Sequence, residues 1–191
     1  MINDNKKSWI LCGYEIFSTD GPNGLKIEVL ARKVNKSKSS FYHYFADIEI
    51  FTDILLEYHL EKAEIISKRE SECKSVNPEL LNVLIEFKQD LLFNRQLRIN
   101  RKIIKFKNCF ENASKKVAES IIEIWAEELN IKNNSYLAEI ILKLSLENFY
   151  LQITEETMNL NWLQNYFKEL QNMVAEFEKN SKRTEVLYGS D

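Results

Sequence analysis

The chain has 191 residues, of which 45% are apolar, enough for one large domain with a buried core. Its 26 basic and 29 acidic residues give a net charge of −3, a balance unlike that of a typical nucleic-acid binder. It contains only four glycines and two prolines, far below the usual roughly 7% and 5%. Because folds with many tight turns need these residues, the composition predicts an all-α fold.

Several functional classes lack their sequence signals. No apolar run approaches the roughly 18 residues of a membrane span, and the N-terminus has no secretory signal. Cys12, Cys73 and Cys109 are odd in number and show no metal-binding spacing, and the only histidines, His43 and His59, lie far apart. We therefore expect reduced thiols, a cytoplasmic location, no metal, no cofactor and no enzymatic activity.

The N-terminal region predicts three short helices. The first covers residues 6–19 and includes Gly13, which serves either close approach of another helix or is simply tolerated. It ends at residues 20–24, where Gly21 suits a C-terminal cap in the left-handed region. Helices over 26–34 and 38–45 follow, joined by a turn of three residues. Two short helices with such a turn are typical of a helix-turn-helix.

The rest of the chain predicts longer helices. We expect them over residues 47–74, from Pro78 through Leu91, over 95–130 as one or two helices with a break near 108–112, over 136–155, and over 160–179. The predicted organisation is an N-terminal helix-turn-helix domain, residues 1–46, followed by a helical domain, residues 47–191.

Residues 38–45 carry the strongest functional signal. Phe41 and Phe45 are four residues apart and are expected to face a small core. The remaining positions, Lys38, Ser39, Ser40, Tyr42, His43 and Tyr44, offer hydroxyls, a cation and polar-tipped rings that suit phosphates and base edges in a DNA major groove. The alternative is an aromatic packing cluster without a role in binding, and the residue pattern alone leaves both open.

Residues 10–55 resemble the DNA-binding domain of TetR-family transcriptional repressors. The resemblance rests on Phe17, Gly21, the Leu25-x-Ile27-x-x-Leu30-Ala31 pattern, the turn at 35–37, the run from Lys38 to Phe45, and then Asp47, Glu49 and Phe51. It implies that the third helix enters the major groove. The implied DNA contacts are Lys26, Lys36, Lys38, Ser39, Ser40, Tyr42, His43 and Tyr44.

The sequence departs from the family pattern at four positions. Asn35 replaces the usual turn glycine, and Lys36 replaces an apolar residue and can add a cation towards DNA. Ala46 and Ile48 stand where the family often has lysines, which removes expected phosphate contacts.

The resemblance also implies a homodimer formed by the last two helices, and the apolar spacing supports it. The expected interface residues are Leu142, Leu146, Leu163, Phe167, Leu170, Val174 and Phe177, the last five at heptad-like spacing. Leu137, Ile141, Leu144 and Leu151 form a second apolar face on the first of these helices, and a partner can cover either face. A single monomeric core is the alternative.

A small-molecule effector is a further implication of the resemblance. Expected pocket residues are Phe87, Leu91, Phe106, Phe110, Trp125 and Phe149, each of which can equally be ordinary core. Residues 95–107 hold six cations and no acid. These cations form a solvated face paired with acids, an anion-binding mouth of the effector cavity, or a further nucleic-acid or protein surface.

Together these features predict a homodimeric regulator that binds a palindromic double-stranded DNA operator and that a small molecule releases. Repression rather than activation is an implication of the family, and the sequence names neither operator, effector nor regulated genes. The alternative is a helical interaction or scaffold protein whose helix-turn-helix no longer binds DNA. The net charge does not contradict DNA binding, because residues 1–46 carry seven basic and four acidic residues.

Overall fold

The computed structural model describes the backbone of residues 4–188 and the side chains of residues 4–177 and 179. Within that part the chain is all-helical without strands, which confirms the predicted fold class. The α-helices are α1 (Asp4–Asp20), α2 (Ile27–Lys33), α3 (Lys38–Tyr44), α4 (Ile48–Ser71), α5 (Leu81–Glu86), α6 (Lys88–Ile99), α7 (Ile104–Glu128), α8 (Ser135–Gln152) and α9 (Leu160–Tyr188). None of the helices described is long and apolar enough to cross a membrane.

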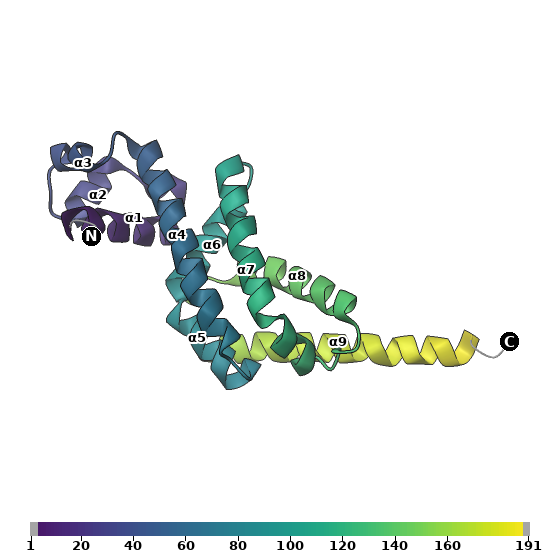
Figure 1. The fold of residues 1–191 in the computed structure, drawn as a ribbon. Coiled ribbons are helices and arrows are strands. Elements are labelled where there is room, and N and C mark those ends of the chain that lie inside the picture. The colour runs from purple at the N-terminus through teal and green to yellow at the C-terminus, as the bar shows by residue number, and fades with distance from the viewer. Residues whose placement is uncertain (1–3, 189–191) are drawn as a thin grey trace.

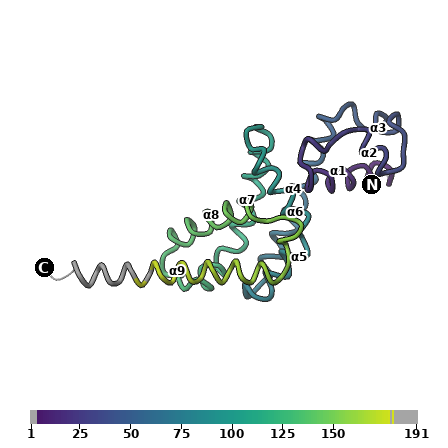
Figure 2. Tube along the Cα trace, turned by 180° about the vertical axis from the view of Figure 1, so that it is seen from behind, coloured from purple at the N-terminus to yellow at the C-terminus, as the bar shows by residue number. Residues whose placement is uncertain are grey.

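Helices α1–α3, called the head below, lie at one end of the molecule, and α4 runs from them into α5–α9, called the body (Figures 1 and 2). Local signals set the boundaries in the head. Gly21 adopts φ 67°, a value that favours glycine, and follows the end of α1. Asn35 adopts φ 54° in the turn after α2, and the Ser37 side chain caps α3 by accepting a hydrogen bond from the Ser40 N–H. These features confirm the predicted helix-turn-helix boundaries to within a residue or two.

The core of the head is aromatic and continues into α4. The buried Phe41 ring lies 5.0 Å from the ring of Phe45 and 5.5 Å from that of Trp9, between ring centroids. Phe51 of α4 packs edge-on against both phenylalanines, and all four side chains belong to the main hydrophobic cluster that runs into the body. The first turns of α4 therefore complete the core beneath α3.

Gly13 of α1 lies against Phe51 of α4, where the two helices pack closely. A Cβ atom at Gly13 would lie 2.4 Å from Cζ of Phe51, whose ring is fully buried. Of the two explanations for Gly13, close approach of another helix and a merely tolerated glycine, the structure supports close approach. The contact is closer than van der Waals distance, so any side chain here requires the Phe51 ring to move.

Gly13→Ala is expected to lower the free energy of unfolding. The cost of overpacking, about 1–3 kcal/mol, exceeds the gain of about 1 kcal/mol from replacing a helical glycine by alanine. Urea unfolding at pH 7.5 measures the difference, with Leu11→Ala on the exposed side of α1 as the control. A Gly13→Ala protein more stable than wild type would show that the space around Phe51 adjusts at little cost.

Two predicted helices in the body were wrong. The expected helix from Pro78 to Leu91 is divided at Phe87, which has φ −101° and ψ 26°, into α5 and α6, and a π-helical turn (Val76–Leu80) contains Pro78. The expected break near 108–112 does not exist, because α7 is continuous there. The chain turns earlier, between α6 and α7, where the Asn100 side chain donates to the Gln96 carbonyl oxygen at 2.9 Å.

Candidate nucleic-acid interface and core cavity

Helix α3 is held to the core of the head by Phe41 and by Phe45, the residue that follows it, and exposes several of its other side chains. Tyr42 is 56% exposed, and Ser39 and His43 are exposed beside it. Tyr44 is half-buried, with its ring 4.9 Å from that of His43, and packs against the core. The aromatic-cluster alternative therefore describes Phe41 and Phe45, and in part Tyr44. It does not describe Tyr42 and His43, whose polar groups remain available on the surface.

The three lysines near α3 differ in their contacts. Lys38 donates to the Glu28 carboxylate of α2 at 2.5 Å, an exposed ion pair that lowers the pKa of Glu28 through the hydrogen bond and the lysine charge. Lys26 is exposed at the N-cap position of α2. The Lys36 amino group points back to α1, where it donates to Asn5 Oδ1 at 2.7 Å and to Ser8 Oγ at 3.2 Å. The Lys36 side chain therefore faces α1 in this structure, and its contact with DNA stays a prediction.

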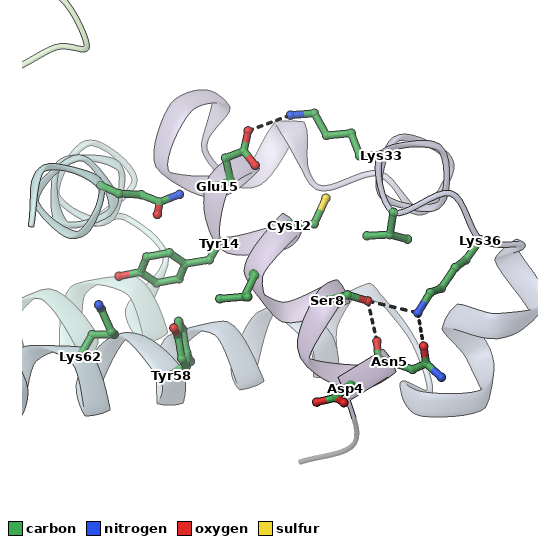
Figure 3. Close-up of a pocket in the computed structure, with 13 residues that line it drawn as sticks. Asp4, Asn5, Ser8, Cys12, Tyr14, Glu15, Lys33, Lys36, Tyr58 and Lys62 are labelled. Carbon is green, nitrogen blue, oxygen red and sulfur yellow. Dashed lines mark hydrogen bonds and ion pairs between the residues drawn. The ribbon is translucent and has the colours of Figure 1, made fainter. Parts of the chain in front are cut away.

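An open groove of about 860 Å³ runs along α1 between the turn after α2 and helix α4 (Figure 3). Figure 3 shows the Lys36, Asn5 and Ser8 contacts on one side of α1 and the Glu15–Lys33 ion pair on another. Tyr14, Tyr58 and Lys62 lie at the opposite end of the groove, towards the body. The groove is thus bordered by mutually paired polar groups on the side of the head.

Three of the six predicted pocket residues meet around a small cavity in the body. Leu91, Trp125 and Phe149 line this core cavity, whose volume is about 30 Å³. Phe110 lies at a separate groove, Phe106 packs edge-on against Phe17 of the head, and Phe87 belongs to a small side cluster. The six candidate pocket residues are therefore divided among different parts of the structure, and a role in an effector pocket stays a prediction.

Glu70 also lines the core cavity and was not predicted from the sequence. Its carboxylate is 0% exposed; Oε2 accepts a hydrogen bond from Ser120 at 2.9 Å, and Oε1 has no partner among the described residues. Burial raises the pKa of Glu70 to about 7, against the hydrogen bond from Ser120, which lowers it. One feature of the sequence could have identified it: Glu70 follows Ala63 and Ile66 at helical spacing, which places this acid on the buried face of α4.

The raised pKa of Glu70 predicts that the contribution of this residue to stability falls as the pH rises. The folded chain holds this proton up to about pH 7, whereas an unfolded glutamate loses it near 4.5. The stabilising contribution is therefore complete below pH 4.5 and is lost as pH rises through 7. Glu70→Gln should raise the free energy of unfolding by about 2–3 kcal/mol at pH 8 and by little at pH 5. Urea unfolding at both values tests this, and an equal difference at both would contradict it.

A buried polar network connects the head to the wall of the core cavity. The Tyr14 hydroxyl of α1 lies 2.6 Å from Nδ1 of His59 and donates to Oδ1 of Asp90 at 2.8 Å. Nε2 of His59 lies 3.0 Å from Oδ1 of Asn94, whose amide donates to the Tyr150 hydroxyl at 3.4 Å. Tyr150 also lines the core cavity. Four helices, α1, α4, α6 and α8, are therefore joined by one chain of contacts.

His59 is neutral at the centre of this network. Full burial lowers its pKa to about 4, the charge of Lys62 also lowers it, and the hydrogen bond with Asn94 opposes both. A neutral imidazole donates through only one nitrogen. His59 can therefore donate either to the Tyr14 hydroxyl or to Oδ1 of Asn94 but not to both, so a change at one member affects the contacts of the others.

The basic residues of 95–107 do not form one helical stripe, because the turn between α6 and α7 divides them. Acidic neighbours pair with most of them. Arg98 and Arg101 contact Glu147, Lys105 contacts Asp53 at 2.8 Å, and Lys107 contacts Glu111. These pairs favour the interpretation as a solvated, acid-paired face. Arg98, Arg101, Lys102 and Lys107 also border an open groove of about 950 Å³ between α7 and α8.

Most of the predicted dimer residues lie inside the chain itself. Leu142, Leu163 and Val174 are buried in its own core, and Leu146, Phe167 and Leu170 are half-buried against it. Of the predicted set, only Phe177 is substantially exposed, at 66%. Exposed apolar residues instead occupy the outer side of α8, at Ile140, Leu144 and Leu151. The buried members are therefore unavailable as a surface. Of the second apolar face of α8, Leu144 and Leu151 are exposed, whereas Leu137 and Ile141 are half-buried against the core.

Comparison with known proteins gives structural likeness without sequence likeness. No family model matches the sequence, and no curated protein matches it. A transcriptional regulator of the TetR/AcrR family from Aquifex aeolicus VF5 superposes with a TM-score of 0.59 and 20% identity, over 91% of this chain and 99% of its own. A TetR-family regulator from Mesorhizobium loti MAFF303099 gives 0.55 and 15%, over 91% and 95%, and one from Rhodococcus sp. gives 0.53 and 12%, over 90% and 97%.

The likeness extends over the helix-turn-helix and the body together. The Aquifex aeolicus and Mesorhizobium loti proteins each match 91% of this chain. This is far more than residues 10–55, on which the sequence resemblance rests. This chain has the fold of TetR-family transcriptional regulators.

Proposed function

We propose that the chain is a homodimeric, DNA-binding transcriptional regulator of the TetR type, a repressor that a small molecule releases from a palindromic operator. The observation that carries the proposal is the surface of α3. Phe41 and Phe45 hold this helix on the head, and Ser39, Tyr42 and His43 are left exposed together. Residues 1–46 form the DNA-binding domain in this proposal, and residues 47–191 the effector-binding and dimerisation domain.

Helix α3 has the size and chemistry to enter a DNA major groove. Its exposed hydroxyls and imidazole can donate to phosphates and reach base edges. Ser40 and Lys26 provide further donors, and Lys38 can exchange its exposed Glu28 partner for a phosphate, since exposed ion pairs contribute little. Because Lys36 is bonded to α1, the expected number of lysine contacts is lower than the sequence predicted.

The proposed dimer surface uses the exposed apolar residues of the last two helices. Ile140, Leu144 and Leu151 of α8 are joined in this proposal by Met173 and Phe177 of α9, all of them exposed. Exposed apolar side chains at helical spacing are typical of a face that a partner covers. Two heads then read half-sites about 34–36 Å apart on DNA.

The core cavity is the proposed effector site, and the buried polar network offers its connection to the head. Tyr150 lines the cavity and receives the long 3.4 Å hydrogen bond from Asn94, the weakest contact of the network. An effector that displaces Tyr150 would break this bond first. Asn94, His59 and Tyr14 would then adjust in turn, which would move α1 relative to the body.

Tyr150→Phe is expected to weaken the effect of an effector on DNA affinity. It removes the hydroxyl that joins the cavity to Asn94 and keeps the ring that fills the core. Operator affinity without effector should stay within about threefold of wild type, whereas the effector-induced loss should shrink several-fold. Fluorescence anisotropy with labelled operator measures both, and Tyr166→Phe, which also loses a buried hydroxyl of the cavity wall, is the control. An effector-induced loss of affinity equal to that of wild type would show that the network does not transmit effector binding to the DNA-binding helices.

An electrophoretic mobility shift tests DNA binding itself. The full chain is mixed with duplex DNA from upstream of its own gene, at 50 and 200 mM salt. A specific shift that weakens at the higher salt supports the proposal. No shift at either salt, with and without cell extract as a source of effector, would favour the helical interaction protein.

A further inference from the structure

The core cavity contains a buried acid that the chain itself leaves incompletely paired. Glu70 is 0% exposed, and among the described residues the only hydrogen bond to its carboxylate comes from Ser120, at Oε2. Among the described residues, no base is within ion-pair distance of it, and Oε1 is without a donor. A buried carboxylate in this condition is costly unless a donor or a cation reaches it.

The walls of the cavity are mostly apolar, and five of the lining side chains are aromatic. Trp125, Phe149, Tyr150, Tyr166 and Phe167 line it together with aliphatic residues. Aromatic faces attract organic cations and stack against aryl rings. Trp125 adds a buried N–H that has no acceptor in the described part of the chain.

These features restrict the chemistry of an occupant. Above about pH 7, where Glu70 is mostly ionised, an anion would be repelled by it, and an apolar molecule would leave Oε1 unpaired at full cost. A neutral donor would satisfy the hydrogen bond without balancing the charge. Only a cation with an N–H group does both, and the ring-lined walls favour an aryl group attached to it.

We propose that the core cavity binds a protonated arylalkylamine, with its ammonium group on Glu70 and its ring between the aromatic walls. This inference rests on the proposed function, because it names the ligand class of the effector site. The carboxylate supplies the acceptor, and Trp125 supplies a donor for a polar substituent on the ligand ring.

The cavity must open to receive such a ligand. Its present volume of about 30 Å³ holds about one water molecule. Phe167 of α9 is half-buried and packs edge-on against Trp125, with 5.6 Å between ring centroids. Rotation of Phe167 away from Trp125 would open the wall on the side of α9 and give the ligand access to Tyr150, which lines the same cavity.

Calorimetric titration of the full-length protein at pH 7.5 tests the proposal. The probes are 2-phenylethylamine, tyramine and tryptamine, which are protonated at this pH, and 2-phenylethanol is the neutral match of the first. At least one amine should bind, and 2-phenylethylamine should bind at least tenfold more tightly than 2-phenylethanol. Glu70→Gln should abolish that preference, Glu70→Asp should retain part of it, and Glu57→Gln, an exposed acid on the same helix, should leave it unchanged.

The alternative occupant is a single water molecule bonded to Glu70. In that case none of the three amines binds, and the proposal is overturned. It is also overturned if amine and alcohol bind equally, or if Glu70→Gln binds the amine as wild type does. The mobility-shift experiment is scored separately: DNA binding without amine binding refutes only the ligand class, and amine binding without DNA binding refutes only the regulator.

Discussion

Replacing Tyr42 and His43 together by alanine is expected to lower the affinity for operator DNA by about 100-fold or more. Each side chain is exposed on α3, and contacts of this kind contribute about 1–3 kcal/mol in each half-site. Fluorescence anisotropy with a labelled operator duplex measures the loss. Binding to unrelated DNA should fall much less, because no lysine or arginine is removed.

The same double variant should remain folded and dimeric. Tyr42 is 56% exposed and His43 lies on the surface, so their removal leaves the core formed by Phe41 and Phe45 intact. Circular dichroism and light scattering check this. Ile65→Ala, on the exposed side of α4, is the control for loss of a surface side chain. If the double variant keeps wild-type operator affinity, α3 does not enter the major groove in the proposed way.

Leu144→Glu combined with Phe177→Glu is expected to convert the dimer to monomer. These side chains are 65% and 66% exposed in the single chain and lie on the two helices of the proposed interface. Burying a carboxylate without a partner costs several kcal/mol, and the twofold axis would bury four. Light scattering at 10 μM measures the mass, which should fall from about 45 to about 23 kDa, twice and once the chain mass of 22.6 kDa.

Operator affinity should fall with the dimer. Two linked heads gain roughly 10²–10⁴-fold over one by effective concentration, so the monomeric variant should bind a two-half-site operator at least about 100-fold more weakly. Ile65→Glu introduces the same charge at an exposed apolar position on α4 and should change neither mass nor affinity. A double variant that stays dimeric would place the interface on another surface.

The sequence predicted the head well because its signals are local. Helix ends there depend on Gly21, Asn35 and Ser37, whose backbone and capping preferences act within a few residues. The division of core and surface on α3 follows from the spacing of Phe41 and Phe45. These features need no information from distant parts of the chain.

The errors in the body arise where tertiary packing decides. Asn108 and Asn112 suggested a break, but both lie on the exposed side of α7, where asparagine costs only a fraction of a kcal/mol. The chain turns instead between α6 and α7. The unexpected division of the earlier helix is at Phe87, whose ring packs with Ile66 of α4 and with Val83 of α5, the helix that ends there. Nothing in the residues flanking Phe87 indicates that contact.

The dimer surface and the core cavity show a related limit. Heptad-like spacing identifies an apolar face on α9, but spacing does not distinguish a face covered by the same chain from one covered by a partner. Leu163 and Val174 belong to the first case and Phe177 to the second in our proposal. Glu70 was missed because a single acid within an amphipathic helix looks like a surface residue until its neighbours are known.

In vitro selection of duplex DNA tests the central claim most directly. The full-length protein is incubated with a library containing about 30 random base pairs, and bound DNA is amplified and sequenced over successive rounds. We expect enrichment of a palindrome whose half-sites are about 10 base pairs apart, centre to centre, and loss of that enrichment with the Tyr42→Ala, His43→Ala double variant. A wild-type protein that enriches no sequence above the starting library would contradict DNA recognition by this helix-turn-helix.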